Sequence, residues 1–243
     1  MASYEQEIRQ ELERWQREMQ RQPNFVNRLT RKAQTKVNSL IPEKIHQGIT
    51  VAIRQMIHGV LFGAEHTTPA PLLNQPLAVR ELLVREKIDQ YRKAAAAEGG
   101  ITGAGGILLG LADFPLLLGI KLKLLFSIAS LYGFATKEYQ ERVYLLHIFQ
   151  LAFSSKEHRR NVYQQIVDWK EKVQELPGTL KDFDWRNFQQ EYRDHIDLAK
   201  MAQLVPFIGA PVGAVVNYQL VKKLGNTAMN AYRMRWFDEG REE

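Results

Sequence analysis

The stretch GGITGAGGILLGLADFPLLLGI, residues 99–120, decides the fold class of this chain. It holds seven glycines, and its one charged side chain is Asp113. A P-loop needs a lysine directly after its glycines, and a dinucleotide-binding loop needs a strand before them. No lysine directly follows the glycines here, and the segment before them, YRKAAAAE, favours a helix and not a strand. Gly103, Gly106 and Gly110 instead share one face of a helix, which Asp113 extends. Since each glycine costs about 1 kcal/mol in a helix relative to alanine, this stripe predicts close packing against another backbone.

A second stretch, LVPFIGAPVGAVVNYQLV at residues 204–221, repeats the pattern without any charge. Gly209, Gly213 and Asn217 recur every four residues and so lie on one helix face. We expect the two glycine-rich helices to pack together and to bring Asp113 close to Asn217. The alternative for Asp113 is a helix cap, with one helix ending there and another beginning before Pro115.

The remaining sequence predicts an all-α fold, because apolar residues recur at steps of three and four and no run alternates for long. Residues 138–153 are apolar almost all round and predict a central buried helix. Amphipathic helices are expected over 162–176 and over 185–199. We expect a peripheral, charged amphipathic helix in residues 1–35, followed by a single multi-helix domain over 36–243. The N-terminal helix carries an apolar seam of Tyr4, Ile8, Leu12, Trp15 and Met19.

Composition narrows the possible functions. The chain has 33 Lys and Arg against 27 Asp and Glu, a net charge of +6, so an acidic partner is expected. The cations are mixed with acids and do not form a single basic stripe, so nucleic acid is not expected as a partner. There is no cysteine, and the six histidines lack zinc-binding spacing, so we predict no metal, no cofactor and no catalytic residue. The N-terminus has no apolar signal region, and the cytoplasm is therefore the expected location.

Lysine and arginine flank both glycine-rich segments at both ends. Cations at both ends argue against a simple membrane crossing, since the cytoplasmic side attracts them. Two arrangements fit these flanks. One is a shallow insertion from a single side of the membrane, and the other is a buried helical hairpin in a soluble protein.

Three segments together resemble the EcsC protein family: GITGAGGILLGLADFPLLL, ASLYGF and PFIGAPVGAVVNYQLVKKLGNTAMNAYRMRW. The resemblance covers about residues 80–237 and leaves the N-terminal helix outside. It implies a bacterial protein on the cytoplasmic side of a membrane transport system, because the family takes its name from an operon that also encodes an ABC-type transporter. It implies no catalytic residues.

Two groups of residues are candidates for function. Asp113 is expected to bind a ligand or an ion, because a carboxylate in so apolar a stretch must be paired, protonated or functional. Its expected neighbours in that site are Lys121, Tyr132, Asn217 and Tyr218. A second group combines cations with an aromatic ring and is expected to contact membrane lipid or another anion. Its members are Lys222, Lys223, Arg233, Arg235 and Trp236.

Three functions follow as hypotheses. The first is a non-enzymatic helical accessory protein, at the membrane face or with an ABC-type transport system. The second is an enzyme of unknown reaction that uses a perturbed carboxylate at Asp113. The third is a soluble oligomeric scaffold, assembled through the seam from Tyr4 to Met19.

Overall fold

This computed structural model describes residues 4–21, 43–62, 70–103, 106–154, 158–177, 182, 184 and 209–240. For 43–49, 52, 61–62, 100–103, 106–115, 117 and 209–213 it describes the backbone alone. All the elements in these ranges are helices, which confirms the all-α prediction. They are α1 (Tyr4–Gln20), α3 (Glu43–Phe62), α4 (Leu77–Gly103), α5 (Gly106–Leu131), α6 (Tyr139–Phe153), α7 (Arg159–Val167), α8 (Trp169–Glu175) and α11 (Gly209–Asp238).

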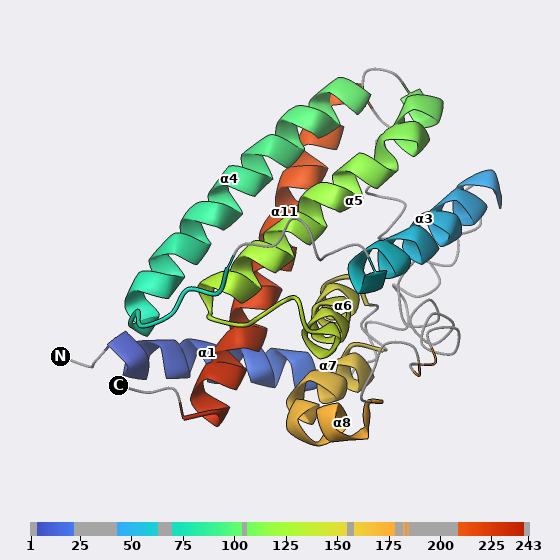
Figure 1. Cartoon of the computed structure of the whole chain (residues 1–243). Helices are drawn as coiled ribbons and strands as arrows, with labels where there is room; N and C mark the ends of the chain where they lie inside the picture. The colour runs from blue at the N-terminus through green and yellow to red at the C-terminus, as the bar shows by residue number, and fades with distance from the viewer. Residues whose placement is uncertain are drawn as a thin grey trace.

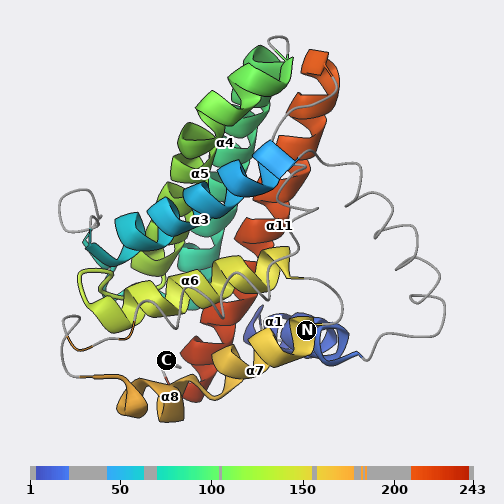
Figure 2. The ribbon, with the colours of Figure 1, turned by 90° about the vertical axis from the view of Figure 1, so that its right-hand side faces the viewer.

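Three long helices, α4, α5 and α11, lie side by side and form the frame of the molecule (Figures 1 and 2). Helix α4 runs antiparallel to both α5 and α11. Two contacts fix the register of α4 against α11: Arg92 lies over the ring of Tyr218, and Ile88 packs against Gly225. The Tyr132 hydroxyl donates to Glu81 and fixes the register of α4 against α5.

One end of this three-helix bundle projects away from α1, α7 and α8 (Figures 1 and 2). We call this end the finger and define it as residues 94–103 of α4, 106–120 of α5 and 209–217 of α11. It contains the glycine-rich parts of all three helices. None of the described helices is long and apolar enough to cross a membrane.

The other end of the bundle, which we call the base, is covered by shorter helices. Helix α6 is buried along nearly its whole length, as predicted for residues 138–153. Helix α1 lies across the base, where Ile8 and Leu12 enter the core at 2% and 6% exposure. The N-terminal helix is therefore at the edge of the molecule, as expected, yet it is part of the core. Its division from the rest at residue 35 stays a prediction, because residues 22–42 lie outside the described residues.

A glycine turn carries the chain from α5 towards α6. Gly133 has a φ of 88°, a left-handed conformation that glycine adopts without strain. The amide of Phe134 donates to the carbonyl of Ala129, and that of Gly133 donates to Ser130. These two bonds form a Schellman cap, which explains the ASLYGF segment at residues 129–134.

The structure corrects three local predictions. The glycines at 103–110 do not share one helix, because α4 ends at Gly103 and α5 begins at Gly106. Helix α5 then continues through Asp113 and Pro115, so the cap predicted at Asp113 is wrong. A proline inside a helix costs about 3 kcal/mol, which the packing of α5 against its neighbours must offset.

The predicted helix over 162–176 is divided at Asp168 into α7 and α8. The carboxylate of Asp168 accepts from the side-chain amide of Gln164, and its backbone N–H donates to the carbonyl of Gln164. Aspartate favours such local hydrogen bonds over a continuing helix. The amphipathic segment predicted at 185–199 lies outside the described residues.

Candidate functional site

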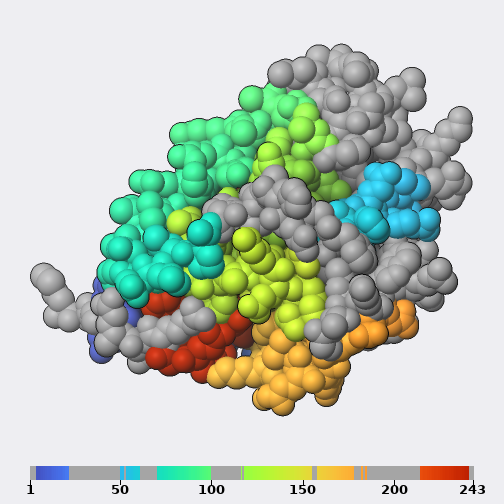
Figure 3. Space-filling view, in the orientation of Figure 1, coloured from blue at the N-terminus to red at the C-terminus, as the bar shows by residue number. Residues whose placement is uncertain are grey.

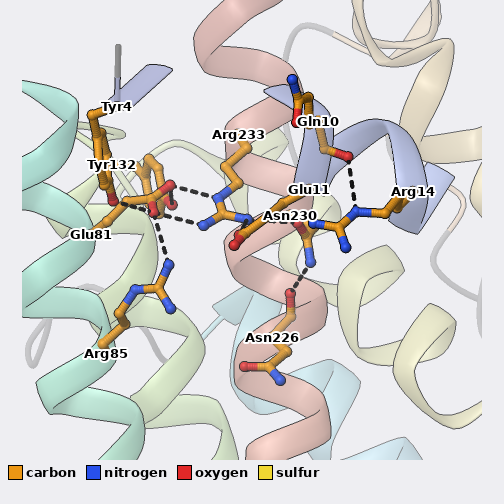
Figure 4. Close-up of polar contacts among 10 residues, drawn as sticks. All are labelled: Tyr4, Gln10, Glu11, Arg14, Glu81, Arg85, Tyr132, Asn226, Asn230 and Arg233. Atoms are coloured by element: carbon orange, nitrogen blue, oxygen red, sulfur yellow. Dashed lines mark hydrogen bonds and ion pairs between the residues drawn. The ribbon is translucent and has the colours of Figure 1, made fainter. Parts of the chain in front are cut away.

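Arg233 on α11 is the centre of a buried polar network at the base of the bundle (Figure 4). Its Nε donates to Glu81 Oε1 at 2.5 Å and its Nη2 to Oε2 at 2.7 Å, a two-pronged ion pair between α11 and α4. The exposed fractions of the two side chains are 1% and 0%. Two phenols also donate to this carboxylate, Tyr132 at 3.2 Å and Tyr4 of α1 at 2.8 Å.

The remaining nitrogen of Arg233 faces α1. Its Nη1 donates to Glu11 Oε2 at 3.1 Å and to Asn230 Oδ1 at 3.1 Å. The amide nitrogen of Asn230 in turn donates to the backbone carbonyl of Asn226 at 2.9 Å. One guanidinium thus joins the N-terminal helix, the first helix of the bundle and the C-terminal helix.

The electrostatics of this network fix its protonation states. Burial alone would raise the pKa of Glu81, but hydrogen bonds and attraction from Arg233 outweigh it and leave the pKa below its usual value. Burial raises the pKa of Tyr132 well above 10 and, with the hydrogen bond to Glu81, raises that of Tyr4 to about 12. At neutral pH the carboxylate therefore accepts and the phenols donate. This arrangement suits a structural network better than acid–base chemistry.

A second ion pair joins α6 to α11. Arg235 Nη1 donates to Glu141 Oε2 at 2.7 Å, and the Tyr232 hydroxyl donates to Oε1 of the same carboxylate at 2.5 Å. The guanidinium carbon of Arg235 also lies 3.9 Å from the centre of the Phe134 ring and 4.8 Å from that of Tyr144. Aromatic faces attract a cation in this geometry.

Arg233, Arg235 and Trp236 were predicted to contact membrane lipid or another anion, and the structure instead places them largely out of solvent. Arg233 and Trp236 are buried, at 1% and 4% exposure, and the side chain of Arg235 is 15% exposed. Their counter-charges, Glu81 and Glu141, come from helices distant in sequence. A local view of the segment RMRW could not include them. Lys222 and Lys223 are exposed, so their contact with an anion stays a prediction.

The five residues predicted to form a ligand site are not gathered in one place. Tyr132 belongs to the Arg233 network, level with Glu81. Tyr218 is half-buried beneath Arg92, eleven positions further along α4 and so about 16 Å away. The backbone of Asp113 lies in the finger, but its side chain is outside the described residues. Binding by Asp113 stays a prediction.

Lys121 of α5 and Asn217 of α11 are buried in the bundle, at 0% and 1% exposure. Burial lowers the pKa of Lys121 to about 7. The Oδ1 atom of Asn217 is buried without a hydrogen-bond partner. Asn217 is therefore in the interior, as predicted. Across the described ranges, no three acidic or histidine side chains gather as a metal site would require.

Cations from three helices lie at one level, where the finger joins the rest of the bundle. Lys123 precedes Tyr132 by nine positions, which places it near residue 90 of α4. Lys222 and Lys223 precede Gly225 by three and two, which places them near residues 91 and 90. Lys93, also exposed, and Arg92 lie on α4 at this level. We call these five residues the collar.

An acidic side chain, that of Asp89 on α4, lies at the level of the collar. Asp89 pairs with Arg92 and with Lys93, and these contacts lower the pKa of Asp89. The other three collar cations, Lys123, Lys222 and Lys223, lie on α5 and α11. The collar is therefore a basic ring on the bundle, directly beneath an apolar end.

Two of the hollows lined by described residues open on the surface near the base. The larger, about 490 Å³, lies between the loop at 70–76 and Trp236. Its arginine, Arg80, donates to the backbone carbonyls of Leu72, Gln75 and Leu131 and so fastens that loop. The smaller, about 250 Å³, lies between α8 and the end of α11, which emerge side by side at the lower edge of the molecule (Figure 3).

The chain matches known proteins over almost its whole length. A family profile described as the EcsC protein family matches residues 6–237, and so includes the N-terminal helix that the sequence motifs did not reach. Protein EcsC of Bacillus subtilis (strain 168) is 43% identical over 233 residues, 96% of each chain. The uncharacterized protein YdbA of the same organism is 26% identical over 245 residues, 93% of this chain and 90% of that one. No solved structure gives a significant match.

Proposed function

The chain belongs to the EcsC protein family, and we propose that it is a non-enzymatic accessory protein that binds the cytoplasmic face of a membrane. The observation that carries this proposal is the collar. Exposed lysines of α4, α5 and α11 lie at one level, and all three glycine-rich segments lie on the same side of that level. A basic ring beneath an apolar end is the distribution that an anionic lipid surface attracts.

The buried charges support a structural role for the base. Glu81 and Glu141 are each engaged by an arginine of α11 and by at least one tyrosine. Acids and bases held in this way brace helices against one another. We therefore propose that the base holds the finger in position. We also propose that the protein contacts an ABC-type transport system, the partner implied by the family, at the same membrane face.

Flotation with liposomes tests the membrane proposal. The protein is expected to float with phosphatidylglycerol-containing liposomes at about 0.05 M salt and to float less with purely zwitterionic ones. Charge reversal of the collar by Lys222→Glu with Lys223→Glu should weaken binding by at least about 2 kcal/mol, roughly thirtyfold, because each surface cation contributes about 1 kcal/mol.

The matched control reverses two exposed arginines at the opposite end, Arg14→Glu with Arg160→Glu. Both double variants change the net charge from +6 to +2, so they differ only in where the charge is lost. Binding in the control should stay within about threefold of the wild type. Equal losses in the two variants, or no flotation of the wild type, would contradict the proposal.

A further inference from the structure

We infer that the finger inserts into one leaflet of the membrane, to the depth at which Leu116 and Val215 reach the boundary between headgroups and acyl chains. This inference rests on the proposed function and adds to it the element that enters the lipid. Binding through the collar alone would leave the finger in water.

Two exposed apolar side chains mark this depth. Leu116 of α5 is 53% exposed and Val215 of α11 is 61% exposed. Leu116 precedes Tyr132 by sixteen positions, which places it level with residue 97 of α4. Val215 precedes Gly225 by ten, which places it level with residue 98. Two helices thus expose apolar side chains at the same height, on the side of the collar away from the base.

The spacing matches the layers of a bilayer. Residues 97–98 lie four to eight positions beyond the collar, which occupies the levels of residues 90–93, or about 6–12 Å. The headgroup layer on each side of a bilayer is about 5–8 Å thick, and lysine side chains can extend along that direction. With the collar cations at the phosphates, Leu116 and Val215 therefore reach the acyl boundary.

The end of the finger then enters the hydrocarbon only a short way. From residue 98 to the end of α4 at Gly103 is about 8 Å, within the 5–10 Å typical of interfacial helices. The helices satisfy most of their own backbone hydrogen bonds, which lipid requires. Glu98 of α4 lies at the acyl boundary itself, where its carboxylate stays within reach of the headgroup layer.

Single-cysteine labelling tests the depth, and the chain suits it because it has no native cysteine. Leu116→Cys and Val215→Cys are each labelled with the fluorophore NBD and mixed with phosphatidylglycerol-containing liposomes. The control is Leu82→Cys, 59% exposed on α4 but about 14 Å from the collar towards the base. We expect lipid to shift the emission to the blue, with quenching by acyl-chain nitroxides, at 116 and 215 and not at 82.

The outcomes separate this inference from the proposed function. If the labelled proteins float but positions 116 and 215 remain open to aqueous iodide, the inference is overturned and membrane binding stands. If none of them floats, both fail. As a second readout, Leu116→Asp or Val215→Asp should reduce flotation at high salt by about tenfold or more, whereas Leu82→Asp should not, because only the finger meets hydrocarbon.

Discussion

Arg233 and Glu81 form an ion pair that is almost entirely out of water, and removing one partner leaves the other charge uncompensated. Glu81→Gln should lower the free energy of unfolding by about 3 kcal/mol in urea titrations at pH 7. The control is Glu86→Gln, an exposed position on the same helix, where a change under about 0.5 kcal/mol is expected. Similar losses of unfolding free energy at both positions would show that the loss at Glu81 does not come from its buried ion pair.

The pair also sets a pH dependence with a definite sign. The folded-state pKa of Glu81 is lowered, so its contribution is fully present above the unfolded pKa of about 4.3. It is lost as the pH falls through the folded value.

Lys121 gives a pH dependence of the same sign in the alkaline range, because burial lowers its folded pKa to about 7 while the unfolded chain keeps about 10.4. Between these values the unfolded state binds more protons, so the free energy of unfolding should rise with pH, by as much as about 4 kcal/mol. Above about pH 10 it should fall again, since burial raises the pKa of Tyr132 and Tyr232 in the folded state only. Urea titrations from about pH 7 to about pH 10 measure this rise.

The matched variant is Lys121→Met, which removes the amine and keeps much of the side-chain volume. It should be more stable than the wild type at pH 7 and should show a flat profile up to about pH 10. An equal rise in the variant would assign the pH dependence to other groups.

At the scale of elements, Gly225 is where α4 and α11 approach most tightly among the glycines whose surroundings are described. A Cβ atom there would lie 2.6 Å from Cγ1 of Ile88. Gly225→Ala should therefore lower the free energy of unfolding by about 1–2 kcal/mol, because overpacking exceeds the gain in helix propensity. Gly59→Ala and Gly119→Ala are the controls. They meet open space, and each should gain up to about 1 kcal/mol. Thermal and urea unfolding of all three variants measure these changes. A gain in stability for Gly225→Ala would contradict the prediction.

Sequence periodicity predicted the helices well, because it depends on neighbours three and four residues apart. The buried face of α1 followed directly from such spacing, and α6 was predicted to be buried because its residues are apolar almost all round. The close approach at Gly225 could not be predicted, because it depends on Ile88, on another helix. The break between α4, which ends at Gly103, and α5, which begins at Gly106, was also missed, since glycine favours both the end of a helix and close packing.

The candidate site was harder to predict than the fold. Asn217 was expected in the interior and lies there, and the exposed lysines of the collar were noted as flanks of the apolar segments. Lys121 was expected only as a neighbour of Asp113, and its complete burial was not predicted. Arg233 was expected at the surface because its counter-charge Glu81 is 152 positions away in sequence. An arginine in an otherwise apolar helical stretch signals such a hidden partner, although it does not identify it.

At the scale of the whole molecule, the base and the finger have different compositions and, on our proposal, different tasks. The base joins α1, α4, α6 and α11 through ion pairs and aromatic rings, such as the stacked Tyr132 and Tyr232 with ring centres 5.5 Å apart. The finger is apolar and rich in glycine. A rigid base is needed to hold three helix ends at one height, since a tilt of one helix would move its lysines out of the collar.

Helix α1 is the segment on which this rigidity can be tested. It contributes Ile8 and Leu12 to the core, Tyr4 to Glu81, and Glu11 to Arg233. Deleting residues 1–21 should lower the free energy of unfolding by about 4 kcal/mol or more, the value expected for losing the burial of two large aliphatic side chains. A control that alters only the exposed pair, Glu13→Ala with Arg17→Ala, should change it by less than about 1 kcal/mol.

The same deletion decides the scaffold hypothesis. The apolar seam of α1 packs against α7, α11 and α4 of its own chain, so it is not available to a second copy in this fold. The mass measured by light scattering should therefore change only by that of the deleted segment. A fall to half or less would mean that the seam joins copies, and α1 would then have to leave the base to do so. Unfolding and mass measured on one preparation separate these cases, because loss of stability without loss of mass is expected only if α1 acts within its own chain.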